Sequence, residues 1–128
     1  MAVRVVRLGS ERVRGEGTRI GTVRHPPRGV PRSQHAAQNW YDVWLPELAP
    51  SRPLVRLAQR AETAAAWKAF ARRYRAEMAA PEKVHLLRTL AVLSREADFS
   101  VGCYCPDESR CHRSVLRALL KEQGATFA

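Results

Sequence analysis

The stretch FSVGCYCPDESRCHRSVLRALLKEQG, residues 99–124, predicts a strand, a turn and a helix in direct succession. Residues 99–105 form a short apolar run of the kind found in buried strands. The polar turn opens at Pro106, and we expect a helix from near residue 109, with leucines at helical spacing, that stops at Gly124. A strand that runs directly into a helix is typical of α/β proteins.

Two further strands are expected near the N-terminus. Residues 3–9 are rich in β-branched side chains, and residues 19–25 alternate until a pair of prolines stops them. Residues 26–39 then form a connector with three prolines and one glycine. A connector of this length in a small domain is usually functional or disordered.

The middle of the chain predicts helices. Trp40, Trp44 and Leu48 recur every four residues, which indicates a short amphipathic turn or helix with both tryptophans in the core. Residues 62–79 place aromatic and apolar side chains on one helical face, and a further helix is expected from Pro81 to Asp98.

Together these elements predict one small α/β domain over residues 1–128, with a short, mostly parallel sheet flanked by helices. The hydrophobic content of 45% suffices for a core. No apolar run approaches the ~20 residues of a membrane span, and the start of the chain lacks the apolar region of a signal peptide. We therefore expect a soluble, cytoplasmic protein with no membrane partner.

The charge of the chain is strongly positive. Twenty-two Lys and Arg residues against twelve Asp and Glu residues give +10, and residues 1–35 carry eight arginines and two glutamates. Such a surface attracts a phosphorylated small molecule or nucleic acid. An arginine-rich solvated face with no partner explains the same numbers, and the charge alone does not choose between the two.

All three cysteines, Cys103, Cys105 and Cys111, lie within nine positions, and His112 and Arg113 follow at once. An odd, crowded set of cysteines does not resemble a secreted disulfide framework. A cysteine at a helix N-terminus beside arginine and histidine is expected to have a lowered pKa and to act as a nucleophile. The cysteine-phosphatase loop needs five residues between cysteine and arginine, and neither Cys105 to Arg110, with four, nor Cys103 to Arg110, with six, has that spacing.

Metal binding is the second interpretation of the same cluster. Cys103, Cys105 and Cys111, with His112, would form a Cys₃His set of the kind that zinc accepts. Neighbouring residues of a helix point about 100° apart, which argues against Cys111 and His112 as joint ligands, and His25 or His35 would be the replacement. The third interpretation is structural, with cysteines as small core residues, and for Cys103 it is the favoured one.

Three ordered blocks resemble the family called domain of unknown function 488. CYCPDESRCHRSVL (103–116) resembles its Cys-His-Arg signature, while GTVRHPPRGV (21–30) and WLPELAPS (44–51) resemble blocks of its YeaO-like branch. The chain departs from that branch at Val23, His25 and Pro26. The resemblance implies a small α/β domain and carries no settled activity.

By position, the resemblance singles out residues of the two blocks: Arg24, Arg28 and Gly29 in one, and Cys111, His112, Arg113 and Ser114 in the other. The loops that follow two strands can meet at one sheet edge, where their arginines would surround the helix N-terminus as an anion pocket.

Two functions are compatible with such a pocket. In the first, an enzyme acts on a phosphate-bearing or nucleic-acid-derived substrate, with Cys111 as nucleophile or metal ligand and His112 as acid/base. In the second, a noncatalytic nucleic-acid-binding or regulatory module uses its arginines alone. Structural zinc on Cys103, Cys105 and Cys111 is compatible with both.

Overall fold

The computed structural model describes residues 1–128 and contains one four-stranded sheet with strand order β1-β4-β2-β3, in which every strand pair is parallel. The strands are β1 (Val3–Arg7), β2 (Thr18–Gly21), β3 (Val43–Trp44) and β4 (Phe99–Cys103). The α-helices are α1 (Arg52–Arg60), α2 (Ala64–Met78), α3 (Pro81–Leu93) and α4 (His112–Glu122). The predicted α/β class and parallel sheet are confirmed.

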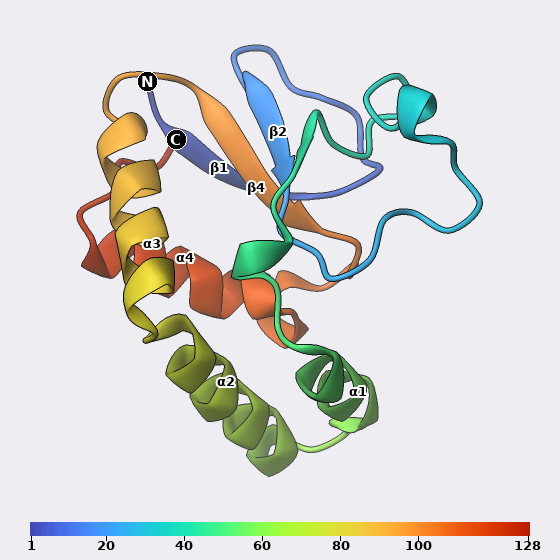
Figure 1. Cartoon of the computed structure of the whole chain (residues 1–128), viewed down its shortest axis with the longest axis vertical. Coiled ribbons are helices and arrows are strands. Elements are labelled where there is room, and N and C mark those ends of the chain that lie inside the picture. The colour runs from blue at the N-terminus through green and yellow to red at the C-terminus, as the bar shows by residue number, and fades with distance from the viewer.

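Strand β4 is central because its sequence is apolar except for Ser100. All five of its residues are buried, and it pairs with β1 on one side and β2 on the other. Its carboxyl end therefore lies between the ends of β1 and β2, where ligands bind in parallel sheets. The two chain termini lie side by side (Figure 1), and the Val3 amide donates to the Thr126 carbonyl at 2.9 Å.

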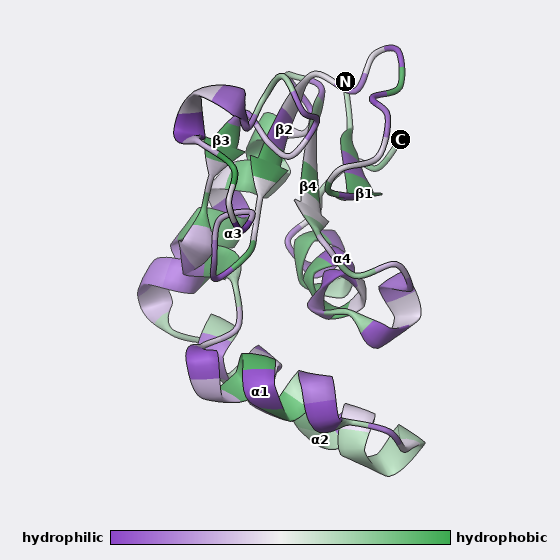
Figure 2. Cartoon of the chain, turned by 90° about the vertical axis from the view of Figure 1, so that its right-hand side faces the viewer, coloured by the Kyte–Doolittle hydropathy of each residue, from purple (hydrophilic) through white to green (hydrophobic).

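The helices cover one face of the sheet. Phe99 and Val101 of β4 pack into a single apolar cluster with Leu116 of α4 and Phe70 of α2. Figure 1 shows the sheet at one end of the molecule, α1 and α2 at the other, and α4 between them. The helices mix apolar and polar residues (Figure 2), as expected for helices with one buried face. No helix combines the length and apolar character that a membrane crossing requires.

The predicted helical turn around residues 40–48 is wrong. The segment contains the two-residue strand β3 and a short 3₁₀ helix, Pro46–Leu48. The Leu45 amide donates to the Gly21 carbonyl at 2.8 Å, so this backbone extends the sheet instead of bonding to itself. Trp44 is 42% exposed and not a core residue. Its indole N–H donates to the Val23 carbonyl at 2.7 Å.

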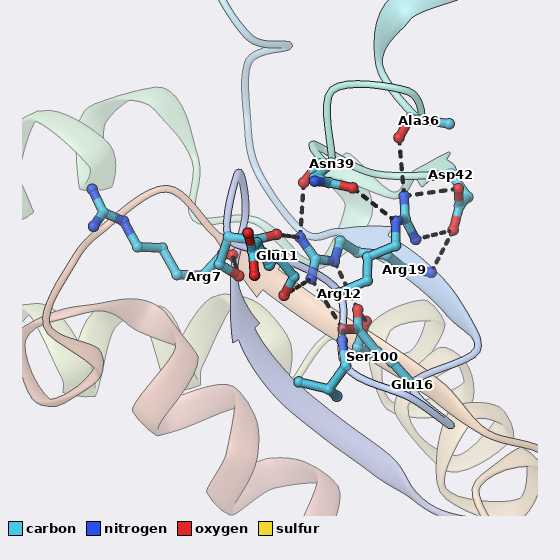
Figure 3. Close-up of polar contacts among 11 residues, drawn as sticks. Arg7, Glu11, Arg12, Glu16, Arg19, Ala36, Asn39, Asp42 and Ser100 are labelled. Carbon is cyan, nitrogen blue, oxygen red and sulfur yellow. Dashed lines mark hydrogen bonds and ion pairs between the residues drawn. The ribbon is translucent and has the colours of Figure 1, made fainter.

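Loops and a buried ion pair cover the other face of the sheet. Arg19 of β2 is fully buried and pairs with Glu16 at 2.7 Å, and Ser100 of β4 donates to the same carboxylate at 2.7 Å. Figure 3 shows the Arg19 guanidinium at the centre of this network, next to the pair that Arg12 forms with Asp42. Two arginines of the basic N-terminal region, Arg12 and Arg19, thus serve the fold.

Stability should depend on pH through Glu16. Burial raises the pKa of this carboxyl, but hydrogen bonds from Arg19 and Ser100 outweigh burial and hold the pKa at about 2, below the ordinary 4.5. The unfolded chain then binds more protons than the folded one, so this stabilisation is complete above pH 4.5 and is lost as the pH falls towards 2. A shift of this size corresponds to about 3 kcal/mol.

Urea unfolding at about pH 6 and about pH 3 measures this loss, and Glu16→Gln is the control. We expect the change in unfolding free energy between the two pH values to be clearly smaller in the variant, because only the other carboxyls still titrate. An equal change in both proteins would contradict the role of Glu16.

Candidate functional site

The three cysteines meet because β4 ends where α4 begins. Cys103 is the last residue of β4, and the chain then turns through a short 3₁₀ helix, Glu108–Arg110. Asp107 caps that turn by accepting from the Ser109 amide at 3.0 Å and from the Ser109 hydroxyl at 2.7 Å. The turn brings Cys111 back beside Cys103.

Cys111 is the N-cap of α4 and not a helical residue. The helical spacing that argued against Cys111 and His112 as joint ligands therefore does not apply to this pair. The Cys111 backbone is extended, with φ −132° and ψ 151°, and the helix begins only at His112. Two neighbouring residues point about 100° apart only when both are helical. With Cys111 outside the helix, its thiol and the imidazole of His112 face the same point.

The resulting cluster has the composition of a metal site. One ligand atom each from Cys103, Cys111 and His112 lie within 4.8 Å of one another, all three residues are buried, and together they could hold a metal ion. The Cys105 sulfur lies 3.8 Å from that of Cys103. His35, considered from the sequence as a replacement ligand, instead contacts the Val30 carbonyl at 3.1 Å, away from the cluster.

The imidazole of His112 is fixed in one tautomer. Its Nε2 lies 2.7 Å from the carbonyl oxygen of Thr22 in the loop after β2. Because a carbonyl only accepts, Nε2 carries the proton, and Nδ1 keeps its lone pair. Nδ1 lies 3.9 Å from the Cys111 sulfur, so the free lone pair faces the thiols. A backbone carbonyl that orients a metal-binding histidine in this way is a common feature of metal sites.

The thiols share protons unequally. Hydrogen bonds from Cys103 and then Cys111, with the charge of Arg113, lower the pKa of Cys105, whereas donation to Cys105 raises the pKa of Cys103. Arg113 is 3% exposed and pairs with no carboxylate. Its Nη2 donates to the Cys105 carbonyl at 2.6 Å, while its Nε has no partner. The charge of this buried cation therefore acts on the Cys105 thiol and on the Asp107 carboxyl, and lowers the pKa of both.

The cluster opens on a cavity of about 340 Å³. All four candidate ligands line it, and Cys105 is the only one of them that is not classed as buried. Its polar rim comprises Arg24, His25 and Arg110, and its apolar wall includes Phe70 and Val55. A ligand in this cavity would thus reach the thiols from the side of Cys105.

The other residues predicted for the site are placed differently. Arg24 lines the cavity, but its guanidinium also donates to the Ala49 and Pro50 carbonyls, at 3.0 Å each. Arg28 lies in a neighbouring groove, and the adjacent Gly29 adopts φ +74°. Ser114 donates to the Cys111 carbonyl at 3.0 Å, which caps the first turn of α4. The structure therefore does not bring Arg24, Arg28 and Arg113 together on one ligand position.

Sequence reasoning missed Tyr104 as a site residue. It lies between Cys103 and Cys105 just after β4 ends, lines the cavity with them, and its hydroxyl donates to the His25 carbonyl at 2.8 Å. This bond fixes the loop after β2 against the end of β4. The sequence carried no signal for this bond, because it joins residues 79 positions apart in the chain.

The fold and the site define an α/β protein with a Cys-His-Arg motif at the start of the helix that follows its central strand. The chain belongs to the DUF488 family: the family model described as the active DUF488-N3 subclade matches residues 3–124. The resemblance drawn from the sequence blocks is confirmed by this match. No curated protein and no solved structure matches the chain.

Proposed function

We propose that this protein is a zinc-dependent enzyme that acts on an anionic, phosphate-bearing substrate. The observation that carries the proposal is the close approach of the Cys103, Cys111 and His112 ligand atoms beside a cavity, with the Cys105 sulfur 3.8 Å from that of Cys103. Cys103, Cys111 and His112 are the buried ligands, and Cys105 is the fourth, on the cavity side. The description of the subclade as active agrees with an enzyme.

The distances fit the metal. Two sulfurs bound to one tetrahedral zinc at about 2.3 Å are about 3.8 Å apart, and the Cys103 and Cys105 sulfurs are 3.8 Å apart. For a sulfur and a nitrogen the corresponding separation is about 3.6 Å, against 3.9 Å between Cys111 Sγ and His112 Nδ1. These two separations match zinc geometry. Cys105 lies outside the group of ligand atoms within 4.8 Å of one another, so it would move towards the ion as the fourth ligand.

The charges fit as well. Three thiolates around a divalent cation leave one net negative charge, and the buried guanidinium of Arg113 supplies the compensating positive charge. His112 as a ligand also accounts for the proton on its Nε2, since metal-binding imidazoles donate their other nitrogen to a fixed acceptor.

The access that the cavity gives a substrate to the proposed ion favours a catalytic zinc over a structural one. A structural site is closed by four ligands, whereas a catalytic site keeps one position for water or substrate. All four ligands line the cavity and Cys105 is the least buried of them, so it is the one a substrate can displace. Bound zinc would supply a Lewis acid at that position. Arg110 and His25, at the rim, would hold the anionic part of the substrate.

In this proposal Cys111 and His112 are ligands and not the nucleophile and the acid/base. Cys111 is 1% exposed, so no substrate reaches its sulfur without a structural change. A rival function without metal would use the Cys105 thiolate itself as the nucleophile, and the lowered pKa of Cys105 favours it. Metal content separates the two.

The first measurement is elemental analysis of protein purified without chelator or metal-binding tag, with thiols counted on the same sample. We expect about one zinc per chain, and thiols that react with a disulfide reagent only after chelation, because bound thiolates are protected. Chelation should also lower the melting temperature, since the metal binds the folded chain. Metal-free protein in which one thiol reacts rapidly below neutral pH would overturn the proposal and favour the Cys105 nucleophile.

A further inference from the structure

Three hollows adjoin at the carboxyl ends of the strands, and His25 lines all of them. The first is the thiol cavity. The second is a groove of about 710 Å³ between the ends of β1 and β2, which shares His25 and Tyr104 with the cavity. The third, of about 460 Å³, lies against α1 and shares His25 with both. A ligand larger than the thiol cavity can therefore extend from it in two directions.

The hollow against α1 is lined by cations without partners. Arg28, Arg52 and Arg56 all line it, all are exposed, and none forms an ion pair or a side-chain hydrogen bond. Arg52 and Arg56 are one helical turn apart and so project from the same side of α1. Elsewhere in the chain, Arg12, Arg19, Arg75 and Arg117 are each paired with a carboxylate. Unpaired guanidinium groups around a hollow are suited to phosphate oxygens.

The groove on the other side of His25 has aromatic walls. Trp40 and Tyr104 pack edge to face, with ring centroids 5.8 Å apart, and both line the groove with Arg7 and Arg28. Gly9 makes room for the indole, because a Cβ at this position would lie 2.8 Å from a Trp40 ring carbon. Arg28 lines this groove and the α1 hollow, so the aromatic and cationic regions are continuous.

We propose that these two hollows bind a nucleotide unit, with its base in the groove of Trp40 and Tyr104 and its phosphate on Arg28, Arg52 and Arg56. Aromatic side chains beside unpaired arginines are the combination with which proteins hold single-stranded nucleic acid and nucleotides. This inference rests on the proposed function, because it names the substrate class of the thiol cavity. The thiol cavity, which shares His25 with both subsites, would hold the part of the substrate that reacts.

The nucleotide unit bound in these hollows could be a free mononucleotide or one nucleotide of a single-stranded nucleic acid. The probes are therefore deoxyadenosine monophosphate, deoxyribose 5-phosphate and a fluorescent ten-residue DNA single strand, titrated against the protein as purified, with its metal content measured on the same sample. We expect the mononucleotide to bind about 5- to 150-fold more tightly than the sugar phosphate, which is the range for one stacked base. If the single strand binds more tightly than deoxyadenosine monophosphate, the natural ligand is a polymer. If the two bind equally well, the natural ligand is the free nucleotide.

The phosphate subsite is tested with Arg28→Gln/Arg56→Gln. The matched control is Arg72→Gln/Arg73→Gln on α2, which removes the same charge from exposed residues that line none of the three hollows. We expect the first double variant to weaken nucleotide binding at least tenfold and the control to change it less than twofold. For the single strand, the slope of log affinity against log salt should fall by up to about 1.4 in the first variant, or about 0.7 per lost phosphate contact.

Three results would overturn the inference: no binding of either nucleotide probe, sugar phosphate binding as tight as nucleotide binding, or equal weakening in the control variant. Each of these can occur in a protein that contains one zinc per chain, so failure here is distinct from failure of the metal site. Conversely, metal-free protein that still binds the nucleotide would overturn the zinc proposal alone.

Discussion

Replacing Arg19 with methionine is expected to lower the free energy of unfolding by about 3–5 kcal/mol, as loss of one partner of a buried ion pair does. The Arg19 guanidinium donates to both oxygens of Glu16, at 2.7 and 3.0 Å, and to the Ser10 and Asn39 carbonyls at 2.9 and 2.8 Å. The variant leaves the Glu16 carboxylate, which is 2% exposed, without its cation. Urea unfolding at neutral pH, followed by circular dichroism, measures the change.

Two controls separate burial from charge. Arg75→Met removes the same guanidinium from an exposed pair with Glu122, and exposed pairs contribute about 0–1 kcal/mol. Glu16→Gln/Arg19→Met removes both charges and should cost less than Arg19→Met alone, because no uncompensated charge remains. If Arg19→Met costs no more than Arg75→Met, the ion pair does not hold the loops to the sheet.

The strand–turn–helix of residues 99–124 could be predicted because its pattern is local. An apolar run, a proline turn and leucines at helical spacing require no knowledge of distant residues. The strand β3 could not be predicted in this way. Its two residues are extended because Gly21 and Arg19 of β2 offer carbonyls to Leu45 and Asp42, and such pairing is a tertiary effect.

The sequence predicted the roles of the arginines only in part. A charge count cannot distinguish Arg19, which is fully buried against Glu16, from Arg28, which is exposed and unpaired. The sequence predicted an anion pocket from Arg24, Arg28 and Arg113, whereas Arg24 and Arg113 both bind backbone carbonyls. Partners of a buried charge come from distant segments, so only the fold assigns them.

The cysteine cluster could be recognised from its residue types but not from its geometry. The sequence predicted a helix that includes both Cys111 and His112, and adjacent residues of a helix point too far apart to bind one ion. The helix begins one residue later than that argument needs, and the extended N-cap turns the Cys111 thiol towards Nδ1 of His112. Exact helix ends are the least predictable feature of a sequence, and here one residue decides the chemistry.

The two serine variants Cys111→Ser and Cys105→Ser should differ in metal content, and this is the largest effect we expect at the site. Cys111 is one of the three buried ligands, so its loss leaves Cys103 and His112 with only the displaceable Cys105, and we expect almost no zinc after purification. Cys105 is the displaceable ligand, so Cys105→Ser should keep zinc with an affinity lowered by about 10–100-fold, comparable to the loss of a supporting interaction.

Elemental analysis and competition with a chromophoric chelator measure both effects, and the melting temperature with and without chelator provides a check on folding. Cys111→Ser should melt at the temperature of the chelated wild type and should not respond to chelator, because it has no metal to lose. Cys105→Ser should still respond. Equal loss of zinc in the two variants would mean that all four ligands close a structural site, and a substrate could then reach the metal only by displacing a ligand that the fold requires.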